Sequence, residues 1–332
     1  MSHGKFPHTR LRRTRQDSWI RDLVQETRLS AKNLIWPVFV IEGEKKTEAI
    51  SSMPGVNRLS IDLLVEKAKQ AHGYGIPAIA LFPKIDSTLK DEQGSEAVNG
   101  DNLMCRAVRR LKKEIPQLGV MCDVALDPYT NHGHDGIMIG DSIDNDATLE
   151  VIEQQALTLA RAGCNIIGPS EMMDGRVGVI RQALEKNGFK NTMILAYSAK
   201  YASGFYGPFR DAVGSKGALK GDKKTYQQDP SNSDEALREV SMDLQEGADM
   251  VMVKPALPYL DVIYRVKKEF GVPTFAYHVS GEYSMIKAAA QMDWLDEKRC
   301  MTESLLSIRR AGADAILTYY AFELAQSLTE QK

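Results

Sequence analysis

The sequence predicts one (β/α)8 barrel, an α/β fold in which eight parallel strands alternate with helices. Eight short apolar runs alternate along the chain with longer amphipathic stretches, which is typical of strands and helices around a parallel sheet. The length of 332 residues suits one barrel of about 250 residues with added segments. No GxGxxG motif follows the first run, which disfavours the alternative, an open doubly wound sheet with a dinucleotide crevice.

The expected strands are the eight apolar runs, at residues 35–40, 77–82, 119–126, 165–170, 193–200, 250–255, 274–280 and 315–320. The expected helices lie at residues 60–72, 101–114, 146–162, 176–186, 233–246, 259–270, 283–291 and 299–311. Gly163, Gly247 and Gly312 each stand just before a strand, where glycine is typical of the end of a helix. Residues 31–332 are therefore expected to form the catalytic barrel.

Residues 1–30 are predicted to form an arm that contacts a neighbouring subunit. The segment is polar, contains one short helical candidate at residues 17–28, and has too little apolar surface to fold alone. Its arginines also allow a transit peptide, but the Ser-rich amphipathic pattern of such peptides is missing.

The composition favours a small-molecule partner and a cytoplasmic protein. Lys and Arg number 42 against 44 Asp and Glu, so no overall field favours nucleic acid or an anionic membrane. No apolar run reaches the roughly 18 residues needed to span a bilayer, and the first residues have no apolar signal core. The four cysteines show no CxxC spacing, which disfavours both a disulfide framework and a zinc site made of four cysteines.

Polar residues end most of the expected strands. Because the active site of a barrel lies at the carboxyl ends of its strands, these residues are the first candidates for chemistry. They are Asp123 and Asp127 after the third run, Ser170 after the fourth, Lys200 after the fifth, Lys254 after the sixth, Ser280 after the seventh and Tyr319 after the eighth. Ser170 and Tyr197 are further candidates for substrate binding.

Two lysines close consecutive apolar strands, although lysine is rarely buried. Burial and a second cation both favour a neutral amine, which attacks a ketone, so Lys254 is predicted to be a nucleophile with Lys200 beside it. The alternative is that Lys254 only pairs with a carboxylate at the rim of the barrel.

Residues 201–229 are expected to form a lid, because a connection of that length far exceeds the usual 2 to 6 residues of such loops. Its Arg210 and Lys223 are candidates for clamping substrate carboxylates. Lys216, Lys220 and Lys224 are instead expected to be solvated.

The third-strand segment, residues 122–136, gathers carboxylates and imidazoles. Asp123, Asp127, Asp135, His132 and His134 could handle protons or hold a divalent cation. The same residue types are also common in ordinary turns, so their spacing alone decides nothing.

The motifs YSAKYAS, VMVKPALPYLD, GPFRDAVGS, MMDGR and VSGEY together make the chain resemble the porphobilinogen synthase, or 5-aminolevulinate dehydratase, family. The resemblance implies condensation of two molecules of 5-aminolevulinate to porphobilinogen with loss of two waters, in tetrapyrrole (haem) biosynthesis. It implies a Schiff base of the first substrate on Lys254 and of the second on Lys200. It further implies carboxylate recognition by Arg210 and Lys223 for the second substrate, and by Ser280 and Tyr319 for the first.

The family's metal site is altered in this sequence. Many relatives carry three zinc-binding cysteines where this chain has Ala125, Asp127 and Asp135, so no catalytic zinc is expected. The resemblance to the aspartate-bearing branch implies activating Mg²⁺ held through Glu239, and a large homo-oligomer, usually an octamer. Asp123, Asp127 and Asp135 then become candidates for proton transfer, with the role of each left open.

Two other functions are compatible with the same pattern. A Schiff-base aldolase needs one reactive lysine and usually a glycine-rich phosphate site after strands seven and eight, which this sequence lacks. A catalytically silent barrel with a metal-responsive or assembly role would form no reducible adduct with a keto substrate, so borohydride trapping discriminates it.

Overall fold

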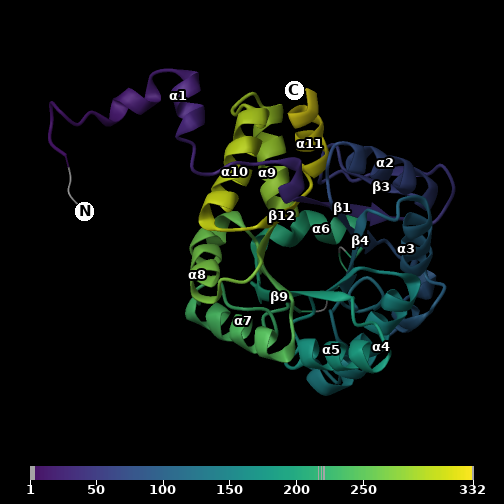
Figure 1. Cartoon of the computed structure of the whole chain (residues 1–332). Helices are drawn as coiled ribbons and strands as arrows, with labels where there is room; N and C mark the ends of the chain where they lie inside the picture. The colour runs from purple at the N-terminus through teal and green to yellow at the C-terminus, as the bar shows by residue number, and fades with distance from the viewer. Residues whose placement is uncertain (1–3, 216, 218, 220, 331–332) are drawn as a thin grey trace.

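The computed structural model describes residues 4–215, 217, 219 and 221–330. Eight parallel strands form a barrel that closes where β12 pairs with β1 (Figure 1). In order around the barrel they are β1 (Leu34–Val40), β4 (Ala78–Pro83), β5 (Gly119–Val124), β8 (Ile166–Pro169), β9 (Met193–Lys200), β10 (Met250–Lys254), β11 (Thr274–His278) and β12 (Ala315–Thr318). The predicted (β/α)8 barrel is confirmed.

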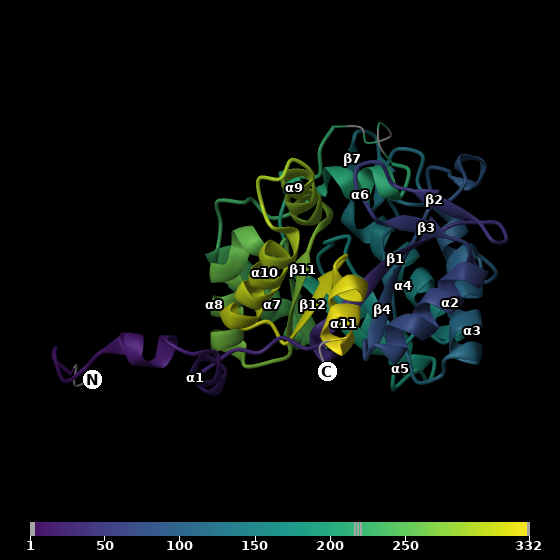
Figure 2. The same ribbon diagram turned by 90° about the horizontal axis from the view of Figure 1, so that it is seen from above.

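Helices surround the barrel and cover its outer surface (Figures 1 and 2). They are α2 (Ile61–Gly73), α3 (Leu103–Glu114), α4 (Asn145–Ala162), α5 (Arg176–Lys186), α7 (Asp234–Glu246), α8 (Leu260–Phe270), α9 (Ser280–Gln291), α10 (Glu297–Ala311) and α11 (Ala321–Glu330). Three of them end at Gly163, Gly247 and Gly312, whose φ angles of 101°, 107° and 120° disfavour any residue with a Cβ, as the sequence predicts.

Short elements decorate the mouth of the barrel, and α6 and α9 lie at the same end of it (Figure 2). Between β9 and α7 lie the 3-10 helix η5 (Gly204–Tyr206) and α6 (Gly207–Ala212). The others are the strands β2 (Thr47–Ala49), β3 (Asn57–Leu59), β6 (Ile137–Ile139) and β7 (Ser142–Asp144) and the 3-10 helices η3 (Ser87–Leu89), η4 (Ser95–Val98) and η6 (Leu257–Tyr259). The 3-10 helix η2 (Ala31–Asn33) lies instead directly before β1, at the amino end of the barrel.

Several expected boundaries were wrong. Strand β11 ends at His278 and Ser280 begins α9, while β12 ends at Thr318 before Tyr319, because the strand-like composition continues into the turns that follow. Helix α11 was missed, and α6 interrupts a segment that was expected to have no regular structure.

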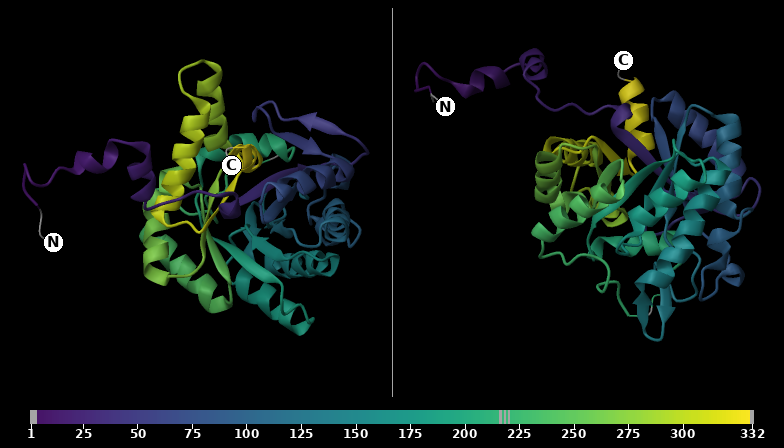
Figure 3. Two further views of the ribbon diagram at one scale, coloured as in Figure 1. Left: turned by 45° about the horizontal axis from the view of Figure 1, so that its top comes forward. Right: turned by 60° about the horizontal axis from the view of Figure 1, so that its bottom comes forward.

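The N-terminal segment extends away from the barrel in every view (Figures 1 to 3). It contains η1 (Leu11–Arg15) and α1 (Ser18–Leu23), which is shorter than the helix expected at residues 17–28. Trp19 and Leu23 are 61% and 70% exposed, so apolar surface on this arm is uncovered in the single chain. No helix in the described part of the chain is long and apolar enough to cross a membrane.

Candidate active site

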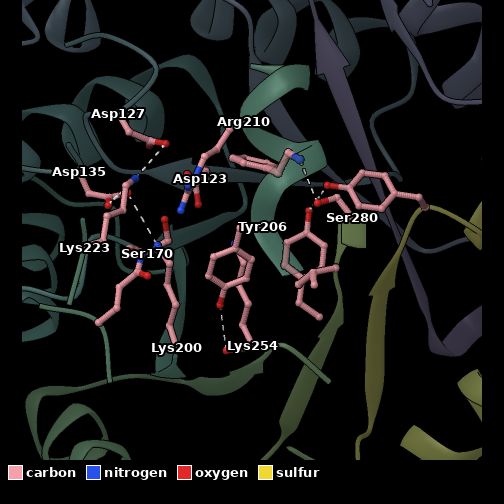
Figure 4. Close-up of a pocket in the computed structure, with 15 residues that line it drawn as sticks. Asp123, Asp127, Asp135, Ser170, Lys200, Tyr206, Arg210, Lys223, Lys254 and Ser280 are labelled. Carbon is pink, nitrogen blue, oxygen red and sulfur yellow. Dashed lines mark hydrogen bonds and ion pairs between the residues drawn. The ribbon is translucent and has the colours of Figure 1, made fainter. Parts of the chain in front are cut away.

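One small cavity, of about 30 Å³, lies at the carboxyl ends of the barrel strands (Figure 4). Its lining brings together residues from six strand ends or the turns after them and from the 201–229 segment. They are Asp123, Asp127, Asp135, Ser170, Lys200, Tyr206, Phe209, Arg210, Lys223, Gln227, Lys254, Tyr277, Val279, Ser280 and Tyr319. The strand-end residues singled out in the sequence therefore meet at one place.

A β-bulge puts the two lysines on the same face of the sheet. Val251 pairs with Ala196, but Val253 pairs with Ala199, so β9 carries one more residue than β10 over this stretch. The extra residue brings Lys254 opposite Lys200. In a regular register Lys254 would pair with Ala199, and the two lysines would point to opposite faces, since side chains alternate along a strand.

The Lys254 amine is enclosed by aromatic rings. Its Nζ lies 4.7 Å from the ring centroid of Tyr277, 5.1 Å from that of Tyr197, and 5.3 Å from those of Tyr206 and Phe209. This burial, followed by the charge of Lys200, lowers the pKa of Lys254 to about 7, against the opposing effect of Asp123. A large fraction of the amine is therefore neutral near pH 7.

A network of opposite charges surrounds Lys200. Its Nζ donates a hydrogen bond to the carbonyl oxygen of Ser170 and lies 3.7 Å from Asp135 Oδ1. Lys223, from the 201–229 segment, lies 2.8 Å from Asp135 Oδ2 and 3.5 Å from Asp127 Oδ2. Burial opposes ionisation of Asp135, but Lys200 and Lys223 outweigh it and lower its pKa.

The pKa values of the other two aspartates, Asp123 and Asp127, are raised rather than lowered. Burial raises the pKa of Asp123 to about 6, although Lys254 and Lys200 both oppose the rise. Burial also raises the pKa of Asp127, which Lys223 opposes. Carboxyls with separated pKa values can exchange protons with a reacting group near neutral pH, as general acid or base.

Arg58 supports the segment that carries Arg210 by hydrogen bonding to its backbone. The guanidinium of Arg58 donates hydrogen bonds of 2.6 Å to the carbonyl oxygens of Asp211 and Ala212, at the end of α6. Arg58 itself is paired with Glu48 at 2.7 Å. Arg210 therefore lines the cavity from a short helix whose end is held by the buried Arg58 side chain.

Three hydroxyls lie on the other side of the cavity. Ser280 Oγ accepts a hydrogen bond of 2.9 Å from the backbone N–H of Phe209, and the hydroxyls of Tyr277 and Tyr319 lie 2.9 Å apart. Both Ser280 and Tyr319 were expected here.

Sequence reasoning missed five lining residues, of which Val279 lies between β11 and α9. Tyr206, Phe209 and Gln227 lie in the 201–229 segment, which has no periodicity that indicates which side chains point inward. Tyr277 lies within β11, and the alternation of side chains along that strand could have indicated it. Lys216 and Lys220 lie outside the described residues, and Lys224 is exposed as expected.

Two other candidates do not line this cavity, and one of them, Glu239, was expected at a separate metal site. Tyr197 is fully buried under the Lys254 amine and does not line the cavity. Glu239 lies on α7 and lines a separate, larger cavity with Asp174 and Glu235, and burial raises the pKa of its carboxyl.

The side chains in the two cavities differ in their suitability for a metal. Asp127 and Asp135 are both engaged by Lys223, so a cation between them would meet an ammonium group. At Glu239 a Mg²⁺ ion that keeps several waters needs only one or two carboxylates, which this cavity offers. Within residues 4–215, 217, 219 and 221–330, no group of three or more His, Cys, Asp or Glu side chains is arranged to hold a metal directly.

Comparison with known proteins gives one family. The model of the delta-aminolevulinic acid dehydratase family matches residues 8–327. The delta-aminolevulinic acid dehydratase of Bradyrhizobium diazoefficiens is 58% identical over 322 residues, covering 97% of this chain and 91% of that protein, and that of Methanothermus sociabilis is 54% identical, covering 98% and 100%. The crystal structure of the Toxoplasma gondii enzyme in complex with the reaction product porphobilinogen has a TM-score of 0.95 and 50% identity, covering 98% of this chain and 92% of that one.

Proposed function

The chain belongs to the delta-aminolevulinic acid dehydratase family, and we propose that Lys254 and Lys200 are the amines on which it condenses its substrate. The enzyme converts two molecules of 5-aminolevulinate into porphobilinogen with loss of two waters. The aldolase and the silent barrel are not needed to explain the site.

One observation supports the two-lysine assignment above all. The two amines lie on paired residues of neighbouring strands and face one small cavity with little room for water. A neutral amine attacks the ketone carbon of 5-aminolevulinate, and the resulting adduct loses one water to form an imine. Holding both substrates in this way makes the condensation nearly unimolecular, which can contribute about 7–11 kcal/mol.

Proton transfer is assigned to the aspartates. Asp123 is the candidate for giving and taking protons near neutral pH, because its pKa is raised to about 6. The charges of Lys254 and Lys200 both act on this carboxyl and keep its pKa from rising further. Asp135 remains ionised and balances the positive charge of Lys200 and Lys223.

Carboxylate recognition is assigned to two pairs of residues. Ser280 and Tyr319 would hold the carboxylate of the first substrate, and Arg210 and Lys223 that of the second. A cavity of about 30 Å³ holds only one or two waters, so the residues of the 201–229 segment that line it, among them Arg210 and Lys223, must move to admit substrate. We therefore treat this segment as a lid.

Reductive trapping tests the lysine assignment. Enzyme mixed with 5-aminolevulinate and borohydride should gain substrate mass on the peptides that contain Lys254 and Lys200. Lys254→Gln should lose its own adduct and porphobilinogen formation, whereas Lys190→Gln, at an exposed lysine that lines neither cavity, should behave as the parent enzyme. Full turnover in Lys254→Gln would refute the assignment.

Mg²⁺ is proposed as an activator that interacts with Glu239. The half-buried position of this carboxyl beside Asp174 and Glu235 supports it, because bound Mg²⁺ would balance the negative charge of three carboxylates that share the cavity with Lys224. After chelation, restored Mg²⁺ should raise turnover in the parent enzyme and not in Glu239→Gln. A requirement for zinc instead would contradict the proposal.

A homo-octamer in the cytoplasm is the proposed state of the protein. The exposed Trp19 and Leu23 of the arm support contacts with neighbouring subunits, and the cysteines are free thiols. Sedimentation velocity measures the assembly, and removal of residues 1–30 should reduce its mass. An unchanged mass would refute the role of the arm.

A further inference from the structure

A fully buried carboxylate, Glu282, ties together the two segments that follow β10 and β11. Its Oε1 accepts a hydrogen bond of 2.6 Å from the backbone N–H of Leu257. Its Oε2 accepts one of 2.6 Å from the N–H of Val279 and a longer one of 3.4 Å from that of Ala256. Ala256 and Leu257 come two and three residues after Lys254, so one side chain fixes the backbone on both sides of the cavity.

These contacts join the backbone that follows Lys254 to the backbone that precedes Ser280. Val279 immediately precedes Ser280, which lines the cavity, and Ala256 closely follows Lys254. The carbonyl oxygen of Lys254 is held from the other side by the N–H of Tyr201 at 3.0 Å and the hydroxyl of Tyr206 at 3.2 Å. The backbone that carries the amine is thus restrained from both directions.

Helix capping alone does not account for this arrangement. A glutamate in the first turn of a helix stabilises that helix from an exposed position and needs only the contact with Val279. Glu282 is instead 0% exposed, and burying a carboxylate is costly unless its hydrogen bonds compensate. The compensating contacts to Ala256 and Leu257 reach across to the Lys254 segment, where they do nothing for α9.

The neighbouring glycine shows how tightly this point is packed. A Cβ on Gly281 would lie 2.4 Å from the carbonyl oxygen of Phe205, at the start of the lid. The lid, the Lys254 segment and the first turn of α9 therefore meet at Gly281 and Glu282.

We propose that Glu282 is a positioning residue, which sets the place of the Lys254 amine relative to the carboxylate site at Ser280 and Tyr319. This inference rests on the proposed role of Lys254. Glutamine at this position keeps the size of the side chain but presents an N–H₂ group to backbone donors, so one or more of the three contacts is lost. Aspartate keeps the charge and the ability to cap α9, but it is one methylene too short to reach Leu257.

The experiment compares Glu282→Gln and Glu282→Asp with the parent enzyme by steady-state kinetics and by borohydride trapping with 5-aminolevulinate, mapped to the Lys254 and Lys200 peptides. Both variants should lose kcat by roughly 10- to 100-fold, since a displacement of about 1 Å can cost about 100-fold. KM should change much less than kcat. Trapping should slow at Lys254 and stay at the parent rate at Lys200, which serves as the internal control for folding.

Glu297→Gln is the matched control, because Glu297 also lies in the first turn of a helix and pairs with Lys287 on the outside of the barrel. It should match the parent in both assays. Parent-like activity in Glu282→Asp would assign the residue to helix capping, and an equal slowing at both lysines would assign it to general stability; either result overturns the inference. A parent enzyme with no adduct at Lys254 would refute the proposed function instead.

Discussion

The charge of Lys200 should control the pH at which Lys254 forms its imine. Burial and Lys200 together lower the pKa of Lys254 to about 7. At pH 7 about half of the amine is then neutral, against roughly one part in 2,500 for a lysine with the ordinary pKa of about 10.4. The site therefore provides about 1,000-fold more nucleophile than an exposed lysine would.

Replacing Lys200 by glutamine removes one of the two causes of the lowered pKa of Lys254, the neighbouring positive charge, and leaves the other, burial. Paired strands lie about 4.8 Å apart. Two unit charges separated by about 5–8 Å interact by about 2–3 kcal/mol at an effective dielectric constant of about 20. Loss of this repulsion favours the protonated form, so the pKa of Lys254 should rise by about 1.5–2, to about 8.5–9. It should stay below the ordinary value because the burial is unchanged.

The assay is the initial rate of cyanoborohydride trapping of 5-aminolevulinate on the Lys254 peptide, measured between about pH 5.5 and 9.5 at constant ionic strength. The parent rate should rise through a midpoint near 7, and the Lys200→Gln midpoint should lie higher, with a rate at pH 6 that is at least about tenfold lower. Lys190→Gln should keep the parent midpoint. A parent midpoint near 10, or a Lys200→Gln midpoint that is unchanged or lower, would refute the reasoning.

Three other substitutions test the surrounding structure. Asp135→Asn removes the carboxylate that Lys200 and Lys223 share, leaves Lys223 with Asp127 alone, and should lower kcat by about 100-fold in a porphobilinogen assay, whereas parent-like turnover would remove Asp135 from the site. Arg58→Lys loses the two-carbonyl contact under α6 and should raise KM more than it lowers kcat; a purely kcat effect would contradict this support role. Arg176→Met leaves the buried Asp243 unpaired and removes the cation 3.8 Å from the buried Glu171, so it should cost about 3–5 kcal/mol in thermal unfolding, a loss that a second change of Asp243→Leu should reverse only in part.

The sequence predicted the barrel and most of the cavity because both follow from local pattern and one rule of the fold. Short apolar runs locate the strands, and the carboxyl ends of parallel strands meet at one face. Lys200 and Lys254 could therefore be placed together without knowledge of any contact. The exact ends of β11 and β12 could not, because a turn directly after a strand has a similar composition.

The bulge in β9 could not have been predicted. Nothing in the letters YSAK indicates that one residue is inserted between Ala196 and Ala199, since register depends on the pairing with β10. Yet a regular register would have separated the two amines. The feature on which the proposed chemistry depends is thus a tertiary one, even though both of its lysines were evident in the sequence.

The ion pairs between the lid and the barrel could not be predicted from the sequence either. In the sequence, Lys223 is a candidate for a substrate carboxylate, and Asp127 and Asp135 are separate candidates for proton transfer. In the structure these groups bind one another, at 3.5 Å and 2.8 Å. A substrate carboxylate that engages Lys223 must therefore replace two carboxylates of the protein. On the proposed assignment, this exchange frees Asp127 when the second substrate arrives and leaves Asp135 to balance Lys200, so that carboxylate recognition and the availability of one proton acceptor are coupled through Lys223.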